Sequence, residues 1–158
     1  MTARRRRWAI EGIPEEFERY ERQLNLPGVG REGQVRLGAS RVLVVGAGGL
    51  GSPVLYYLAA AGIGTLGIAD RDTVSVSNLN RQILHAPGDL GRPKTDSARD
   101  KLAAFRPDLE LRLHCDSLDD RNAPDIVAAY DLVLAAVDSR ESRRVINRAC
   151  YGAGVPWI

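Results

Sequence analysis

Apolar runs of strand length alternate along the chain with longer segments that have helical spacing. The run Val42-Leu43-Val44-Val45 is continuously apolar, which is typical of a parallel strand covered on both faces. The pattern predicts strands over residues 41–45, 65–70, 109–114 and 130–137, with a fifth strand beginning at 155–158. Helices are predicted between them over residues 49–61, 94–105, 122–129 and 141–151. The alternation favours an α/β fold built on a doubly wound, Rossmann-like, mostly parallel sheet.

The two ends of the chain carry weaker patterns. Residues 1–13 contain four consecutive arginines and are expected to form a disordered basic N-terminus. A helix is expected from Pro14, a turn at residues 25–30 and a short helix at residues 31–37. Residues 155–158 resemble a strand cut in its middle. We therefore expect the sheet to be truncated at the C-terminus and the chain to be the N-terminal portion of something longer.

Length and composition indicate an ordinary soluble globular protein, with 158 residues, 44% hydrophobic and 27% charged. This length suggests one domain, here residues 14–158, which is large enough to fold without a disulfide or a metal. The net charge of +2 is too small to argue by itself for nucleic acid binding. No window approaches the roughly 18 apolar residues of a membrane span.

The cysteines and histidines offer little chemistry. Cys115 and Cys150 have no C-x-x-C spacing, which argues against a disulfide framework and against a four-cysteine zinc site. Both are expected to be packing residues, and a reducing, cytoplasmic location fits. His85 and His114 lack the spacing of metal ligands, and His85 is expected to cap or pack within its loop.

A glycine loop, Gly46-x-Gly48-x-x-Gly51, follows the first strand and opens a helix. In such a loop the first glycine allows the tight turn, the second lets the backbone approach a phosphate, and the third lets helix and strand pack. The helix start then offers free N–H groups and a positive dipole end to an anion. Asp70 ends the next strand, where an acid accepts hydrogen bonds from a ribose. At this point NAD and ATP fit equally well, and a capping role for Asp70 stays open.

The polar stretch after the second strand favours ATP. Arg81 would offer a bidentate fork to phosphate oxygens, and Lys94, at a helix start, would offer a point charge. Asp138 ends the fourth strand, at the sheet edge where ligands bind, and one carboxylate plus phosphate oxygens is a typical Mg²⁺ environment. Each residue taken alone could be surface solvation. Asp72 is expected to cap the following turn.

Taken together, these residues resemble the adenylyltransferases that activate sulfur carrier proteins in thiamin and molybdopterin synthesis, the ThiF, MoeB and HesA type, which are relatives of the ubiquitin-activating enzymes. The resemblance runs from about residue 19 to residue 158. Its most specific part is the segment 70–82, whereas the glycine loop is not specific. The matching segments are residues 19–23, 44–53, 70–82, 91–94 and 131–134, the last leading to Asp138.

The resemblance implies a role for each matching residue. Asp70 would hold the ribose, Asp138 would bind Mg²⁺ with Ser139 beside it, and Arg22 would enter the partner's site in a homodimer. Arg22, Arg81, Lys94 and Asp138 would carry the catalysis. The residues expected to contact the nucleotide are Gly46, Gly48, Gly49, Gly51, Asp70, Ser77, Asn78, Leu79, Asn80, Arg81, Lys94, Asp138 and Ser139.

The implied reaction is an ATP-dependent adenylation by the domain 14–158. The C-terminal carboxylate of a ubiquitin-like sulfur carrier protein ending in Gly-Gly would attack the α-phosphorus of ATP and release pyrophosphate. Three alternatives stay open: a catalytically silent truncated partner or scaffold, an enzyme of the same fold that adenylates a carboxylate on modified tRNA, and an NAD-dependent oxidoreductase.

Overall fold

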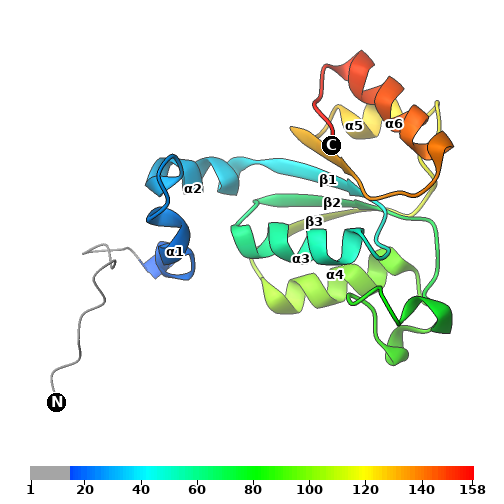
Figure 1. The fold of residues 1–158 in the computed structure, drawn as a ribbon, viewed down its shortest axis with the longest axis horizontal. Coiled ribbons are helices and arrows are strands. Elements are labelled where there is room, and N and C mark those ends of the chain that lie inside the picture. The colour runs from blue at the N-terminus through cyan, green and yellow to red at the C-terminus, as the bar shows by residue number, and fades with distance from the viewer. Residues whose placement is uncertain (1–14) are drawn as a thin grey trace, which may run out of the picture.

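A four-stranded sheet forms the centre of the computed structural model, which describes residues 15–158 (Figure 1). Its strand order is β3-β2-β1-β4, and every neighbouring pair is parallel. In register, Val44 of β1 lies opposite Ile68 of β2 and Leu134 of β4. The predicted α/β fold with a doubly wound parallel sheet is confirmed. The strands are β1 (Arg41–Val45), β2 (Thr65–Ala69), β3 (Glu110–His114) and β4 (Leu132–Ala135).

Helices cover both faces of this sheet (Figure 1). One face is covered by α3 and α4, and the other by α5 and α6. The α-helices are α1 (Glu21–Leu24), α2 (Gly30–Ala39), α3 (Gly51–Ala61), α4 (Lys94–Phe105), α5 (Ala123–Val127) and α6 (Arg140–Ala153). Short 3₁₀ turns are η1 (Glu15–Tyr20), η2 (Val76–Asn78) and η3 (Pro87–Asp89). Over residues 15–158, no helix is both long and apolar enough to cross a membrane.

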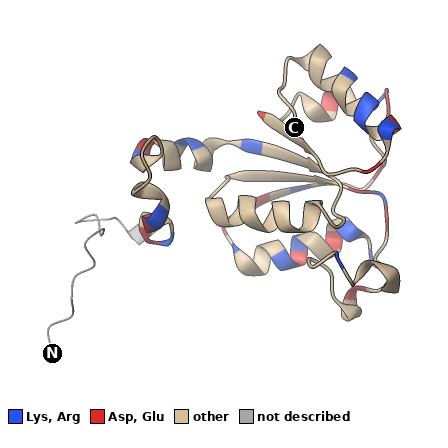
Figure 2. Ribbon diagram, viewed as in Figure 1, with Lys and Arg blue, Asp and Glu red and all other residues tan. Residues whose placement is uncertain are grey.

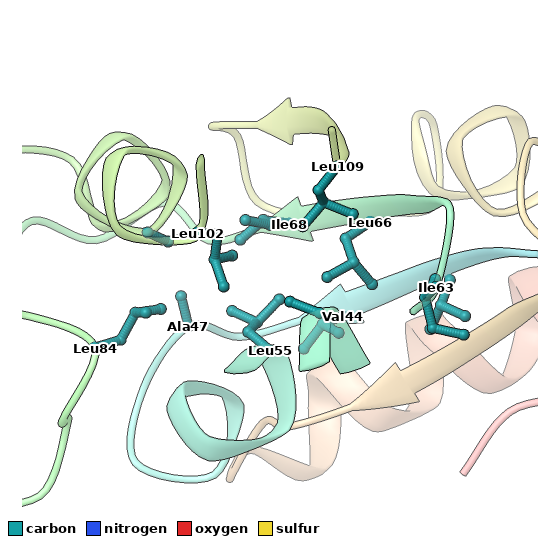
Figure 3. Packing of buried hydrophobic residues seen from close by; sticks show 12 residues of the cluster. Val44, Ala47, Leu55, Ile63, Leu66, Ile68, Leu84, Leu102 and Leu109 are labelled. Atoms are coloured by element: carbon teal, nitrogen blue, oxygen red, sulfur yellow. The ribbon is translucent and has the colours of Figure 1, made fainter. Parts of the chain in front are cut away.

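The hydrophobic core lies in two layers, one on each face of the sheet. Successive residues of β1 point to opposite faces, so Val42 and Val44 join one layer while Leu43 and Val45 join the other. The layer under α3 and α4 brings Val44 together with Leu55 and other apolar side chains (Figure 3). Burial on both faces explains why this strand is continuously apolar in the sequence.

The N-terminal segment differs from the single helix predicted from Pro14. Its described part is the 3₁₀ turn η1 followed by one α-helical turn, α1. The Gln23 amide holds this turn through hydrogen bonds to Gln34 Oε1 at 2.7 Å and to the Ala61 carbonyl at 3.0 Å. The conformation of this segment therefore depends on tertiary contacts, which sequence signals for helix starts and ends do not report. The predicted turn and the helix after it are confirmed, while the expected disordered residues 1–13 lie outside the described residues.

The C-terminal part follows the prediction with shorter elements. Both α5 and β4 lose residues at each end relative to the predicted ranges 122–129 and 130–137. The final segment pairs in parallel with β4 through a bridge between Trp157 and Val133. Ile158 donates to the Val133 carbonyl at 3.0 Å, and the Ala135 N–H donates to Ile158 at 2.8 Å. This is the beginning of a fifth parallel strand, as the sequence predicts.

Candidate functional site

The glycine loop connects β1 to α3 at the carboxyl edge of the sheet (Figure 1). Gly46 has a φ of +101°, and a Cβ there would lie 2.6 Å from the carbonyl oxygen of Ala136. A Cβ on Gly51 would lie 1.8 Å from the carbonyl oxygen of Gly46. Backbone therefore occupies the place of a side chain at both positions. This confirms the tight turn predicted at the first glycine and the close packing predicted at the third.

Gly48 and Gly49 are not required by the packing of the chain itself. A Cβ on Gly49 would lie 3.5 Å from Cγ of Arg81, and one on Gly48 would lie 3.5 Å from Nε2 of Gln82. Both are ordinary contact distances, and neither glycine has a positive φ. Their missing side chains leave the backbone of the turn open to close approach, which suits an anion at a helix start. Their role in nucleotide binding stays a prediction.

Two buried polar atoms beside this loop have no hydrogen-bond partner within the described part of the chain, Ser52 Oγ and Gln82 Oε1. Ser52 is fully buried in the first turn of α3, and Gln82 is 5% exposed. Buried polar atoms normally have a hydrogen-bond partner, so these two atoms are an exception close to the loop. No role was predicted for either residue from the sequence. For Gln82, the sequence signal that could have indicated a role is its position at the end of the polar stretch 75–82.

Asp70 follows β2 and reaches back to the glycine loop. Its Oδ2 accepts the backbone N–H of Ala47 at 2.8 Å, and its Oδ1 accepts the N–H of Asp72 at 2.8 Å. The capping role that the sequence left open is therefore present. Each carboxylate oxygen keeps a second lone pair, so the predicted hydrogen bonds to a ribose remain compatible with this geometry.

Lys94 begins α4 and is held by an ion pair. Its side chain is only 6% exposed, and its Nζ lies 2.9 Å from Oδ2 of Asp72. A buried ammonium needs a paired charge, and the half-exposed Asp72 carboxylate supplies one. The Asp72 carbonyl also accepts the Lys94 N–H at 2.9 Å. Asp72 therefore anchors the start of α4, a correction to the turn cap predicted from sequence.

The polar segment after β2 folds into the turn η2. Asn78 Oδ1 accepts the N–H of Ser75 at 3.1 Å, and the hydroxyls of Ser75 and Ser77 bond at 3.0 Å. Leu79, directly after the turn, is partly buried. Figure 2 shows charged residues on the segments leading to α4 and along α4, whereas α3 carries none. The turn therefore presents the predicted polar residues without placing them in the core.

Arg81 is the predicted cation that the fold brings against the glycine loop. Its Nη1 donates to the Ser77 carbonyl at 2.9 Å and to Asn80 Oδ1 at 3.0 Å. Its methylene groups lie beside Gly49. The side chain is thus oriented by its own segment while the residue remains exposed.

Asp138 and Ser139 follow β4 on the other side of the loop. Because β1 lies between β2 and β4, Asp70 and Asp138 flank the glycine loop from opposite sides. Asp138 is exposed. The Ser139 hydroxyl caps α6 by accepting the N–H of Ser142 at 3.0 Å. The cap gives Ser139 a structural role, while magnesium binding by Asp138 stays a prediction.

Arg22 is not brought together with the other predicted site residues of its own chain. It lies on α1, at the opposite end of the sheet from the glycine loop (Figure 1). Any role in nucleotide chemistry would therefore have to be played in a second copy. The role that the family resemblance implies for Arg22, in the partner's site of a homodimer, stays a prediction.

The cysteines divide between core and surface. Cys150 is 1% exposed on α6, as expected for a packing residue. Cys115 is exposed after β3, with its Sγ 3.3 Å from Thr95 Oγ1, so the expectation of packing was wrong for it. The reason is the position of β3 at the sheet edge, where no further strand of residues 15–158 lies beside it.

A buried carboxylate, Asp89, organises the loop that leads to α4. It is 3% exposed and is paired with Arg92 at 2.9 Å and with Lys101. Burial raises the pKa of Asp89, but hydrogen bonds from Lys101 and from the Ala86 N–H outweigh burial and bring the pKa to about 2. Asp89 therefore stays charged and stabilises the folded loop.

Asp89→Asn is expected to lower the free energy of unfolding at pH 7 by about 2 kcal/mol, since the pKa falls from 3.8 to about 2 on folding. The stabilisation by the carboxylate is complete above its unfolded pKa and is lost as the pH falls from 3.8 towards 2. Urea unfolding between pH 7 and pH 2 measures both effects, with the exposed Asp116→Asn as control. An acid dependence of the Asp89→Asn protein equal to that of the wild type would contradict the role.

Comparison with known proteins gives relatives along nearly the whole chain. The sequence model of the ThiF family matches residues 20–158. The probable adenylyltransferase/sulfurtransferase MoeZ of Mycobacterium tuberculosis is 49% identical over 144 residues, which are 91% of this chain and 37% of MoeZ. The sulfur carrier protein adenylyltransferase of Thermus thermophilus is 46% identical over 144 residues, 91% of this chain and 53% of that protein. The chain thus spans roughly a third to a half of these relatives.

Solved structures share the fold. The E. coli tRNA N6-threonylcarbamoyladenosine dehydratase TcdA superimposes with a TM-score of 0.84 at 25% identity, covering 90% of this chain and 59% of that one. The same enzyme in complex with ATP has a TM-score of 0.78 at 26% identity, covering 81% and 53%. With the family match extending over residues 20–158, this chain belongs to the ThiF family.

Proposed function

We propose that the protein binds ATP at the carboxyl edge of its sheet and adenylates the C-terminal Gly-Gly carboxylate of a ubiquitin-like sulfur carrier protein, releasing pyrophosphate. The contact of Arg81 with Gly49 carries the proposal, because it places the side chain of an arginine against the glycine loop that precedes α3. The names of the two adenylyltransferase relatives support it. The likeness to a dehydratase solved with ATP supports the choice of nucleotide.

The phosphates would lie between the glycine loop and two cations. The open backbone at Gly48 and Gly49 offers N–H groups, as a helix start does for anions. Arg81 donates two hydrogen bonds from Nη1 to its own segment and keeps its remaining N–H groups for phosphate oxygens. Lys94 has three donors, of which Asp72 engages one, so two remain.

The ribose would lie against Asp70, whose two oxygens each accept one backbone N–H and keep one lone pair. These backbone bonds fix the carboxylate in one orientation before a nucleotide binds. Asp70 would then select a nucleotide through its sugar hydroxyls, which both ATP and NAD possess. Selectivity for ATP would come from Arg81 and Lys94, which match a chain of phosphates.

A magnesium ion fits the donor set at this edge. Asp138 is an exposed carboxylate after β4. Within residues 15–158, no group of three or more His, Cys, Asp or Glu side chains could hold a metal ion by itself, so phosphate oxygens would have to supply the other ligands. One carboxylate shared with phosphate oxygens is an arrangement magnesium adopts with nucleotides. When bound, the ion would neutralise phosphate charge, while Asp138 would hold it beside the glycine loop.

The reaction joins two anions, so the residues of the chain would mainly position them and offset charge. A carboxylate oxygen of the carrier forms a bond to the α-phosphorus, and the bond from that phosphorus to the oxygen bridging the β-phosphate breaks. Pyrophosphate leaves with the bonding electron pair, and the acyl-adenylate remains. Arg81 and Lys94 stabilise the charge that develops on the phosphate oxygens. The acyl group would then pass to sulfur or another nucleophile.

A homodimer completes this proposal. Arg22 lies at the end of the sheet opposite its own glycine loop, so a second copy would have to receive it (Figure 1). Gln23 bonds to the Ala61 carbonyl and so fixes the helical turn that carries Arg22. The partner's Arg22 would add a third cation to the phosphates.

The purified protein with a Gly-Gly carrier is expected to exchange labelled pyrophosphate into ATP, and Asp138→Ala is expected to abolish this exchange while leaving the fold intact. The reason is that Asp138 is exposed and contributes little to packing. The control is Asp125→Ala, another exposed aspartate, on α5, which should exchange normally. Circular dichroism and thermal unfolding establish that each variant is folded.

Normal exchange by purified Asp138→Ala protein would refute the assigned role. Exchange that requires modified tRNA and not a carrier would favour the tRNA-modifying alternative. Absence of exchange with every Gly-Gly carrier would identify a silent partner or scaffold, and tight binding of NAD in place of ATP would identify an oxidoreductase.

A further inference from the structure

The peptide group of Ala47, inside the glycine loop, is held on both sides. Its N–H donates to Asp70 Oδ2 at 2.8 Å, and its carbonyl oxygen lies 2.9 Å from Nε2 of His85. Ala47 is fully buried and His85 is 7% exposed, so water does not compete with these bonds. His85 is 38 positions further along the chain, and from the sequence it was expected to cap or pack within its own loop.

The contacts of His85 define one tautomer of its ring. A carbonyl oxygen can only accept, so Nε2 must carry the hydrogen that bonds Ala47. Burial is the largest influence on the ring and lowers the pKa of His85, which keeps it neutral. Nδ1 must then accept, and the Ser97 hydroxyl at 2.9 Å is its donor. Ser97 is fully buried, so this bond too is shielded.

Ser97 belongs to α4, one turn after Lys94. The His85 ring therefore connects two elements that approach the proposed phosphate site independently, the glycine loop and the helix that begins with Lys94. Leu84 and Ala47 belong to the same buried cluster (Figure 3). This packing fixes the backbone at His85 and so the position of its ring.

We propose that His85 is a positioning residue that sets the spacing between the glycine-loop N–H groups and Lys94. It does not touch the nucleotide; it acts through Ala47 on one side and Ser97 on the other. Loss of the hydrogen bond from Nε2 would let the peptide group of Ala47 rotate. The neighbouring N–H groups of the glycine loop would then no longer be held toward the phosphates. This inference rests on the proposed function, because it assumes that ATP phosphates are the ligand of the loop.

Two substitutions separate positioning from packing. Glutamine places an amide N–H near the place of Nε2 and can still donate to Ala47, whereas asparagine ends near the place of Nδ1 and cannot reach it. His85→Asn is expected to weaken ATP binding about tenfold, which is the size of effect expected for one buried hydrogen bond. His85→Gln is expected to stay within about threefold of the wild type.

The measurements are ATP titration calorimetry on the purified protein and amide hydrogen exchange at Ala47, Gly48 and Gly49 without nucleotide. We expect faster exchange of these amides in His85→Asn and near-normal protection in His85→Gln. If His85→Asn does not fold, Ser97→Ala provides the test, because it removes the donor to Nδ1 and leaves the ring in place. Ser97→Ala should weaken ATP binding by about threefold and speed exchange at Ala47.

Equal ATP affinity of wild type and His85→Asn, with unchanged exchange at Ala47, would overturn the inference. The inference would also be overturned if His85→Gln and His85→Asn lost ATP affinity equally, in proportion to their loss of thermal stability. That result would be explained by packing alone. A wild-type protein that binds no ATP would instead refute the proposed function, and the hydrogen-exchange measurements would still decide whether His85 fixes the loop.

Discussion

Arg81→Ala is expected to eliminate ATP–pyrophosphate exchange in a protein that remains folded. The side chain is exposed, and within residues 15–158 its hydrogen bonds join it only to Ser77 and Asn80 of its own segment. Removing an exposed residue of this kind changes stability by about 0.5 kcal/mol or less. The same side chain lies against Gly49, where it would offset charge on the phosphates. An arginine in that role contributes about 10³-fold or more in related phosphoryl transfers.

Two further variants serve as controls for the effect of Arg81→Ala on exchange. Arg81→Lys keeps the charge but loses the planar fork, so we expect exchange to recover only in part. Arg71→Ala removes an exposed arginine from the same loop and should leave exchange unchanged. Exchange rates measured with saturating carrier, together with thermal unfolding of each variant, give the comparison. Wild-type exchange by Arg81→Ala would exclude this residue from the reaction.

Gly51→Ala is expected to destabilise the protein by at least about 3 kcal/mol, the upper range for overpacking of a close contact. The new Cβ would lie 1.8 Å from the carbonyl oxygen of Gly46, a backbone atom that cannot move aside as a flexible side chain can. Relief would require separating the start of α3 from the end of β1. Chemical unfolding, or loss of soluble protein on expression, measures the effect.

Gly49→Ala is the matched substitution, in the same loop and with no comparable obstruction. Its Cβ would meet Arg81 Cγ at 3.5 Å, an ordinary contact, so stability should change little. We expect ATP affinity to fall instead, because the methyl group occupies the open side of the turn. A Gly51→Ala protein as stable as Gly49→Ala would show that the loop is more flexible than its packing indicates.

The elements with strong local signals were predictable from sequence. Residues 41–45 and 94–105 were predicted as strand and helix with the bounds that β1 and α4 have. The first is a continuous apolar run, and the second is a helical pattern that ends before Pro107. The structural roles of Gly46 and Gly51 could also be predicted, because the glycine motif indicates a tight turn at its first glycine and close packing of helix and strand at its third.

The contacts between distant segments were not predictable. Lys94 is paired with Asp72 across 22 positions, and His85 reaches Ala47 across 38. Sequence patterns report which face of an element is apolar, but they do not report which polar side chains meet in the interior. Cys115 illustrates the same limit, because its exposure follows from the edge position of β3 in the strand order.

The contact between Gly46 and Gly51 has a kinetic consequence. A loop closed by backbone packing loses little further conformational entropy when a phosphate enters it. Capture of the proposed nucleotide would then be governed by diffusion and by the charge of Arg81, with no slow rearrangement of the turn beforehand. For the proposed ATP ligand, the loop would be a preformed site whose backbone does not slow capture of the phosphates. In the proposed reaction, discrimination among acceptor carboxylates would therefore belong to surfaces away from this turn.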